Sequence, residues 1–195
     1  MSELKAWAPS RRMLLAAAVG LFAAAADADE LPLLRSARQQ FVQFEPQPTM
    51  RPLMLQDLQG RPALLGLPSH EAKLLYIWAT WCPSCAVELP RLARDQAKLR
   101  RLGISISTVN IDTRPAAAVD AFLRKFGVIN LQVLKDPDGS TLSAENSDGT
   151  TSAFKRWSMP LTFAIDRTGR IRGYIAGSIE WLKPESAAFL EALTA

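Results

Sequence analysis

The sequence predicts an α/β fold, with one mixed sheet and helices packed on its faces. A continuous apolar run from Leu74 to Ala79 is typical of a strand buried on both faces. A helical pattern follows directly from Pro83 to Leu102, with apolar and basic residues on opposite sides. Two apolar segments, Leu161–Asp166 and Arg170–Ala176, flank a short turn and predict an antiparallel hairpin. The sheet therefore needs both parallel and antiparallel pairs.

Two features precede the buried strand. The stretch Leu31–Pro52 contains four prolines and no sustained period, so we expect an extended lead-in. The short apolar segments Leu53–Leu55 and Ala63–Leu65 lie on either side of a turn-rich stretch. They predict a small hairpin, an N-terminal extension of the main fold.

The elements after the first helix follow from turn residues and periodicity. Gly103 ends that helix, and β-branched residues then favour a strand. A proline begins the second helix and Gly127 stops it. The expected elements are a strand at Ile104–Val109, a helix at Pro115–Phe126, a strand at Leu131–Leu134, a short helix at Thr151–Trp157 and a closing helix at Pro184–Leu193.

Length and charge limit the classes of function. The 195 residues suffice for one well-buried core, so one domain is expected. The formal charge of +4 comes from basic residues spread along the chain, without a run of five or more. The tryptophans occur singly, not interleaved with basic residues as single-strand binding requires. We expect no nucleic-acid partner.

The N-terminus has the pattern of a secretory signal. Arg11 and Arg12 precede an apolar run of about 14 residues, which is short of the roughly 20 that span a bilayer. Small residues follow at Ala26 and Ala28. We predict a signal peptide at 1–28 cleaved after Ala28, a lead-in at 29–49 and a domain at 50–195. The paired arginines leave both general and twin-arginine export open, and either leads to a bacterial periplasm, with membrane attachment only if the signal stays uncleaved.

Cys82 and Cys85 are the only cysteines, and they lie three positions apart. A disulfide between them closes a loop so short that its entropic stabilisation is only about 2 kcal/mol, so a redox role is favoured over a structural one. Cys82 lies at the start of a helix, where unpaired N–H groups lower a thiol pKa, and Pro83 suits the first helical position. We expect Cys82 to be the exposed nucleophile and Cys85 the covered residue that resolves the mixed disulfide. Neither Pro83 nor Ser84 is charged, which favours a reductant over a strong oxidant.

Other interpretations of the pair need residues that the chain lacks. A structural zinc site takes four Cys or His ligands, whereas the chain has two cysteines and one histidine. A c-type haem attachment needs His where Ala86 stands. A structural disulfide, a peroxidase with Cys82 as the peroxide-reducing thiol and copper binding by the pair remain open. No metal and no cofactor beyond the disulfide is expected.

The segment Trp78–Cys85, followed by Glu88-Leu89-Pro90, resembles the active-site stretch of the TlpA/ResA-type exported thioredoxin-like proteins. The segments Ser158–Phe163 and Gly177–Trp181 are also similar to this family. The likeness covers roughly residues 50–195 and implies a thioredoxin-like fold.

The resemblance also implies roles for residues around the pair. Pro160 would be cis and face the cysteines, so that Met159 can pair with an extended partner segment. Glu88 would assist the buried thiol by taking or returning its proton, with a solvated helix glutamate as the alternative. Trp81 is expected to flank the reactive sulfur.

The sequence thus predicts a periplasmic thiol:disulfide oxidoreductase that reduces partner proteins through its Trp-Cys-Pro-Ser-Cys dithiol. Its partners would be protein thiols and disulfides, together with an upstream membrane or soluble reductant. The family includes reductants for cytochrome c maturation and for copper-site assembly proteins. Cytochrome c maturation is the first expectation, and copper-site assembly and thiol peroxidase activity are the alternatives.

Overall fold

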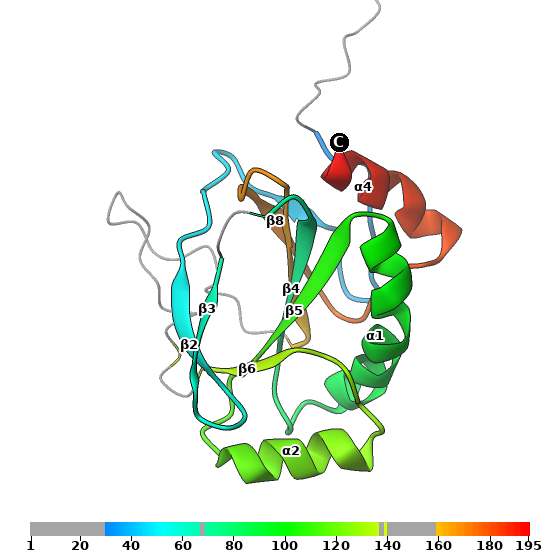
Figure 1. The fold of residues 1–195 in the computed structure, drawn as a ribbon. Helices are drawn as coiled ribbons and strands as arrows, with labels where there is room; N and C mark the ends of the chain where they lie inside the picture. Colours follow the sequence, from blue (N-terminus) through cyan, green and yellow to red (C-terminus); the bar gives the residue numbers. More distant parts are fainter. Residues whose placement is uncertain (1–29, 67–68, 137–138, 140–158) are drawn as a thin grey trace, which may run out of the picture. The chain divides into compact units, whose positions relative to one another are not determined.

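The computed structural model describes residues 30–66, 69–136, 139 and 159–195, and all described elements belong to the unit Leu31–Ala195. It confirms the predicted mixed sheet, with strand order β1-β8-β7-β4-β5-β6-β2-β3 (Figure 1). The strands are β1 (Val42–Gln43), β2 (Leu53–Asp57), β3 (Pro62–Leu65), β4 (Ala72–Trp78), β5 (Ile104–Asn110), β6 (Val133–Lys135), β7 (Leu161–Ile165) and β8 (Ile171–Ala176), and the helices are α1 (Pro83–Arg101), α2 (Ala116–Lys125) and α4 (Pro184–Thr194).

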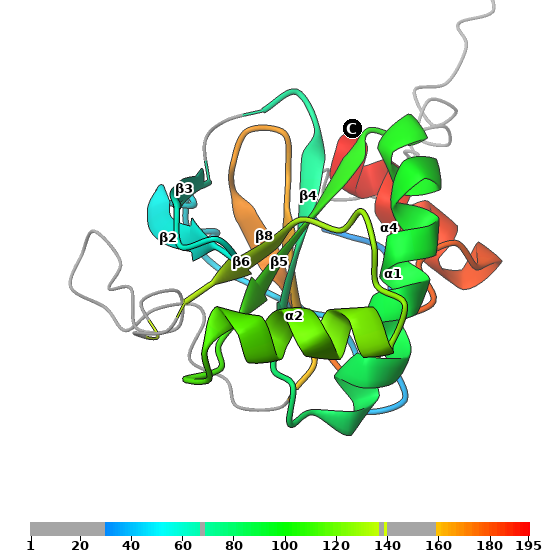
Figure 2. The same ribbon diagram turned by 60° about the horizontal axis from the view of Figure 1, so that its bottom comes forward.

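The strand β4 lies at the centre of the sheet and leads into α1. It pairs in parallel with β5 and antiparallel with β7. Helix α1 connects β4 to β5, and such a crossover keeps the two strands parallel. Helices α1 and α4 lie side by side in both views (Figure 1 and Figure 2). Phe122 of α2 packs on Trp78 of β4 with ring centroids 5.7 Å apart. All of β4 except Lys73 is buried, as its apolar sequence predicts.

The predicted N-terminal hairpin is present as β2 and β3, which pair antiparallel. It is not a separate attachment, because β2 also pairs with β6 and so continues the main sheet. Leu55 and Leu65 point into the core.

The lead-in contributes more than its sequence predicts. Its β1 pairs with β8, and Leu31 and Leu34 are buried in the core. The ring of Phe41 packs edge-on against Phe189 of α4 at 4.8 Å. A two-residue strand is too short for periodicity to reveal, and it covers an edge of β8 that would otherwise be unpaired. The lead-in is therefore held along the edge strand β8 and against α4.

Some predictions fall outside the described residues. These are the signal at 1–28 with cleavage after Ala28, the short helix at Thr151–Trp157, and Ser158 of the proline segment. Across the described part of the chain, no helix has both the length and the apolar character to cross a membrane.

Candidate active site

Cys82 occupies the N-cap of α1, and Pro83 is the first helical residue, as the sequence predicts. The backbone of Cys82 is extended, with φ −94° and ψ 107°, so the chain turns from strand to helix at this residue. The backbone N–H of Cys85 donates a hydrogen bond to Cys82 Sγ at 3.1 Å. The sulfur thus takes the place of the side-chain oxygen that normally caps a helix.

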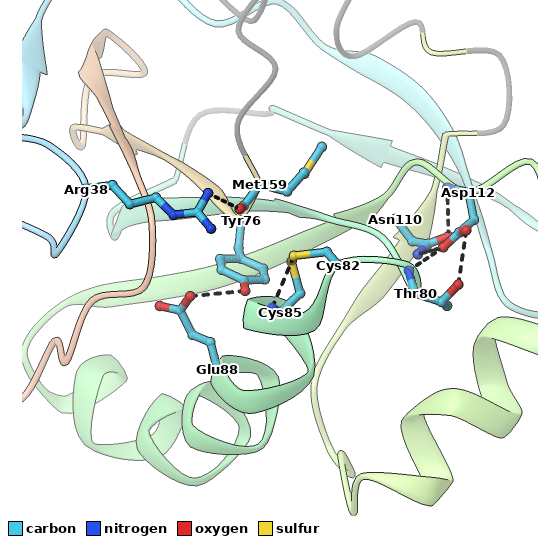
Figure 3. The surroundings of a disulfide bond; sticks show 9 residues. All are labelled: Arg38, Tyr76, Thr80, Cys82, Cys85, Glu88, Asn110, Asp112 and Met159. Carbon is cyan, nitrogen blue, oxygen red and sulfur yellow. Dashed lines mark hydrogen bonds between the residues drawn. A yellow bond between two sulfur atoms is a disulfide. The ribbon is translucent and has the colours of Figure 1, made fainter.

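The two cysteines form a disulfide with their Cα atoms 5.3 Å apart. Cys85 is fully buried, and Cys82 is 4% exposed. Both cysteines are therefore buried in the disulfide-bonded state, so the expected exposed position of Cys82 is wrong for this state, and the roles assigned to the two cysteines stay predictions. In the bonded state the sulfur of Cys82 is held toward the buried Cys85 and the helix end, and Met159 lies beside it (Figure 3).

The surface around Cys82 is apolar. Trp81, directly before Cys82, is 58% exposed, and Pro83, directly after it, is also exposed. Val87 is 67% exposed and, four positions after Pro83, lies on the same side of α1. Ser84 is half-buried. Sequence analysis missed Val87, since a lone apolar residue in an amphipathic helix gives no signal of its own.

The Met159–Pro160 peptide bond is cis, which confirms the expectation from the family resemblance. Ile77 of β4 pairs with Leu161 of β7, so the preceding Pro160 lies across from the end of β4, next to the loop that leads to Cys82. The Pro160 carbonyl accepts a hydrogen bond from the N–H of Gly177 at 2.8 Å. Met159 and Cys82 are thus neighbours although 77 positions separate them (Figure 3).

Glu88 lies one turn after Cys85 and is only 1% exposed, so the alternative of a solvated helix glutamate is wrong. Its Oε1 accepts the N–H of Ile179 at 2.8 Å, and its Oε2 accepts the hydroxyl of Tyr76 at 3.1 Å. Burial raises the pKa of Glu88 to about 7, although these hydrogen bonds favour the charged form. The carboxyl group beneath the disulfide can therefore change protonation state near neutral pH (Figure 3).

Asp112 fixes the loop before Cys82, a role that sequence analysis missed. Its carboxylate accepts the backbone N–H of Thr80 at 2.6 Å and the Thr80 hydroxyl at 3.1 Å. The Asn110 amide donates to the same carboxylate at 2.9 Å. Lys135 donates to the Asp112 backbone carbonyl at 3.1 Å. The sequence signal that could have revealed this role is the group of polar residues at the end of β5. Because β4 and β5 are parallel, these residues lie at the sheet edge where β4 also ends.

The described residues contain no cluster of three or more His, Cys, Asp or Glu side chains that could hold a metal ion. The expectation of a site without metal or cofactor stays a prediction.

Solved structures share this architecture. The chain is similar to a Chlorobium tepidum protein described as a thiol:disulfide interchange protein DsbE, with a TM-score of 0.60 and 26% identity, covering 75% of this chain and 96% of that one. StoA from Bacillus subtilis shares the fold at 17% identity, with a TM-score of 0.53 over 69% of this chain and 92% of that one. The protein is therefore of the thioredoxin-like class, as predicted.

Residues 39–174 match the AhpC/TSA family, and the chain belongs to this family. A curated relative, the thiol-disulfide oxidoreductase ResA of Geobacillus thermodenitrificans, is 27% identical over 65% of this chain and 66% of its own length. The thiol:disulfide interchange protein DsbE of Pseudomonas aeruginosa is 34% identical over 64% of this chain and 56% of its own length. These names confirm the ResA-type resemblance, although the match spans less than two thirds of each relative.

Proposed function

We propose that this protein is a thiol:disulfide oxidoreductase that reduces disulfides of partner proteins through Cys82 and Cys85. The hydrogen bond from the Cys85 N–H to Cys82 Sγ carries the proposal. In the reduced protein the same N–H, together with the positive end of the α1 dipole, stabilises a thiolate on Cys82. Cys85 has no comparable position, because its sulfur lies inside the core.

The reaction proceeds by two exchanges. The Cys82 thiolate attacks one sulfur of a partner disulfide, and the other partner sulfur leaves as a thiolate. Cys85, deprotonated, then attacks Cys82 Sγ, which forms the Cys82–Cys85 disulfide and releases the second partner thiol. The partner gains two electrons and two protons, and an external dithiol returns the pair to its reduced form.

Glu88 is suited to the second exchange. Cys85 attacks only as a thiolate, and its thiol proton needs an acceptor inside the core. A carboxylate whose pKa is raised to about 7 matches the working pH and lies one helical turn away. Tyr76 and the Ile179 N–H hold this carboxyl in place. In this proposal Glu88 takes the Cys85 proton and later gives it up, so that the partner thiolate that leaves Cys82 can be protonated.

Partners dock on the surface around Cys82. Trp81, Pro83 and Val87 offer apolar contact. The Met159 carbonyl accepts one hydrogen bond from Arg38 and keeps a second lone pair for an N–H of an extended partner segment. The proposed site of action is the periplasm, after cleavage of residues 1–28. Its first proposed process is cytochrome c maturation, supported by sequence likeness to ResA and DsbE proteins. A deletion strain that lacks c-type cytochromes but keeps the copper of its oxidase supports that process, and the opposite pattern supports copper-site assembly.

Trapping tests the activity itself. Cys85→Ser should accumulate mixed disulfides with partner proteins, because the second exchange is blocked, whereas Cys82→Ser should accumulate none and lose all turnover above background. Reduction of insulin disulfides with dithiothreitol as the electron source measures that turnover. Equal trapping by both variants contradicts the assigned roles.

Two further measurements separate the alternatives. A reduction potential near the roughly −120 mV of strong periplasmic oxidants would overturn the reductant role. Peroxide consumption far faster than that of simple thiols, with no insulin reduction, would favour the peroxidase instead. If ordinary dithiols leave the Cys82–Cys85 bond intact, the disulfide is structural.

A further inference from the structure

A tight turn of the lead-in, residues 35–40, lies against the end of β8. A bridge between Arg35 and Gln40 closes the turn. Ser36 Oγ accepts the backbone N–H groups of Arg38 and Gln39, each at 3.1 Å. The same hydroxyl donates to the carbonyl of Ala176 at 2.6 Å. The turn is therefore rigid in itself and fixed to the sheet.

Gly177 allows the turn to come this close. Its φ of +91° is one that L side chains rarely adopt. A Cβ at this position would meet Ser36 Oγ at 3.0 Å and Arg38 Cβ at 3.3 Å. Gly177 also donates its N–H to Pro160, so one residue joins the turn to the proline segment.

This arrangement brings Arg38 to the edge of the redox site. Arg38 Nη1 donates to the Met159 carbonyl at 3.0 Å, with the cysteines beyond Met159 (Figure 3). The Arg38 side chain is otherwise exposed, and among the described residues it has no carboxylate partner. By contrast, Arg91 and Arg100 pair with Glu180 and Glu71. The Arg38 guanidinium therefore has further N–H donors, and it lies beside the Met159 carbonyl, the backbone group that an extended partner segment would approach.

We propose that Arg38 is a specificity residue that binds an acidic side chain of the partner segment next to its reacting cysteine. This inference rests on the proposed function. A guanidinium presents five N–H donors in a planar fork, which matches a carboxylate, so one donor on Met159 leaves others for the partner. Binding Met159 also orients the fork along the path of the partner strand. The partners selected are extended segments with Asp or Glu near the disulfide.

Symmetric peptide disulfides test this specificity. The peptides are identical except for Glu, Gln or Lys at each of the two positions on either side of the cysteine. For the full chain we expect kcat/KM to be about fivefold higher with Glu than with Gln at one of these positions, and lowest with Lys. Arg38→Ala should remove the preference, and Arg38→Glu should reverse it in favour of Lys.

Arg35→Glu is the matched control, because it makes the same charge change on the same turn at an exposed residue without a contact to Met159. It should keep the preference for Glu. The proposal is overturned if the wild type shows no preference at any position, or if Arg35→Glu and Arg38→Glu alter it equally, which would indicate a diffuse charge effect.

A second measurement separates this proposal from the proposed function. The Cys85→Ser variant, with and without Arg38→Ala, is equilibrated with the same peptides, and the fraction of mixed disulfide at Cys82 is measured. An Arg38-dependent preference for Glu without turnover of any peptide supports the specificity role while the proposed function fails. Turnover without any Arg38-dependent preference in either measurement overturns the specificity role alone.

Discussion

The two sides of the disulfide differ in nearly every physical property. On the inner side, Cys85, Glu88 and Tyr76 are buried, and their polar groups bond to one another or to backbone. On the outer side, Trp81 and Arg38 are exposed, and Arg38 has donors to spare. Trp81, Cys85 and Glu88 lie at or just before the start of α1, whereas Tyr76 comes from β4 and Arg38 from the lead-in.

The contrast shows how the two sides of one disulfide can serve two tasks. Low dielectric on the inner side raises the pKa of a carboxyl group, which suits it to handle a proton. On the outer side, Trp81 is exposed to solvent and Arg38 has N–H donors beyond the one that it gives to Met159, which suits both to bind a partner. Substitutions on the inner side should therefore alter the pH dependence of stability. Substitutions on the outer side should alter the choice of partner.

Glu88→Gln removes the titratable group of the inner side, and we expect it to change stability more than the other substitutions do. Because the pKa of about 7 in the folded protein exceeds the ordinary glutamate value of 4.5, the folded protein keeps a proton that the unfolded chain releases. The stability of the wild type should therefore fall as pH rises from about 4.5 to 7, by on the order of 3 kcal/mol relative to the variant. Urea unfolding of the oxidised protein from pH 4 to 8 measures this difference.

Glu191→Gln serves as the control, since Glu191 is exposed on α4. It should follow the wild-type pH dependence throughout. Parallel curves for the wild type and Glu88→Gln would mean that folding leaves the pKa of Glu88 unchanged.

Asp112→Ala tests the loop before Cys82, because the Asp112 carboxylate binds Thr80 in that loop. The change leaves the Thr80 N–H without its acceptor and should cost about 2 kcal/mol of unfolding free energy. Asp112→Asn keeps an acceptor oxygen and should recover much of this loss. Asp120→Ala, which breaks only a surface pair with Arg124, should cost about 0.5 kcal/mol. Equal losses for Asp112→Ala and Asp120→Ala would show that the loop needs no such support.

Sequence reasoning predicted the parts of this site that depend on local order. The apolar run of β4, the proline after Cys82 and the two-cysteine spacing each have a direct local meaning, so strand, helix start and disulfide were all predicted. The contacts of Glu88 could not be predicted, because Tyr76 and Ile179 reach it only after the sheet and helix have packed.

The position of the lead-in shows the same limit. Arg38 comes from a segment without periodicity, and its contact with Met159 spans 121 positions. It depends on β1 pairing with β8 and on the space left by Gly177. None of these is visible in the residues near Arg38, whereas the cis bond at Pro160 was expected only from the family resemblance.

Trp81→Ala tests the outer side and should give the smallest effect. Trp81 stands directly before Cys82 with more than half of its surface exposed, so a protein partner can cover it while a small disulfide touches little of it. Losing that contact should cost about 1 kcal/mol, or roughly a fivefold drop in kcat/KM for insulin relative to hydroxyethyl disulfide. Ile129→Ala removes another exposed apolar side chain, from the loop after α2, and should leave this ratio unchanged. If Trp81→Ala lowers kcat/KM equally for insulin and for hydroxyethyl disulfide, Trp81 supports the sulfur chemistry and does not bind the partner.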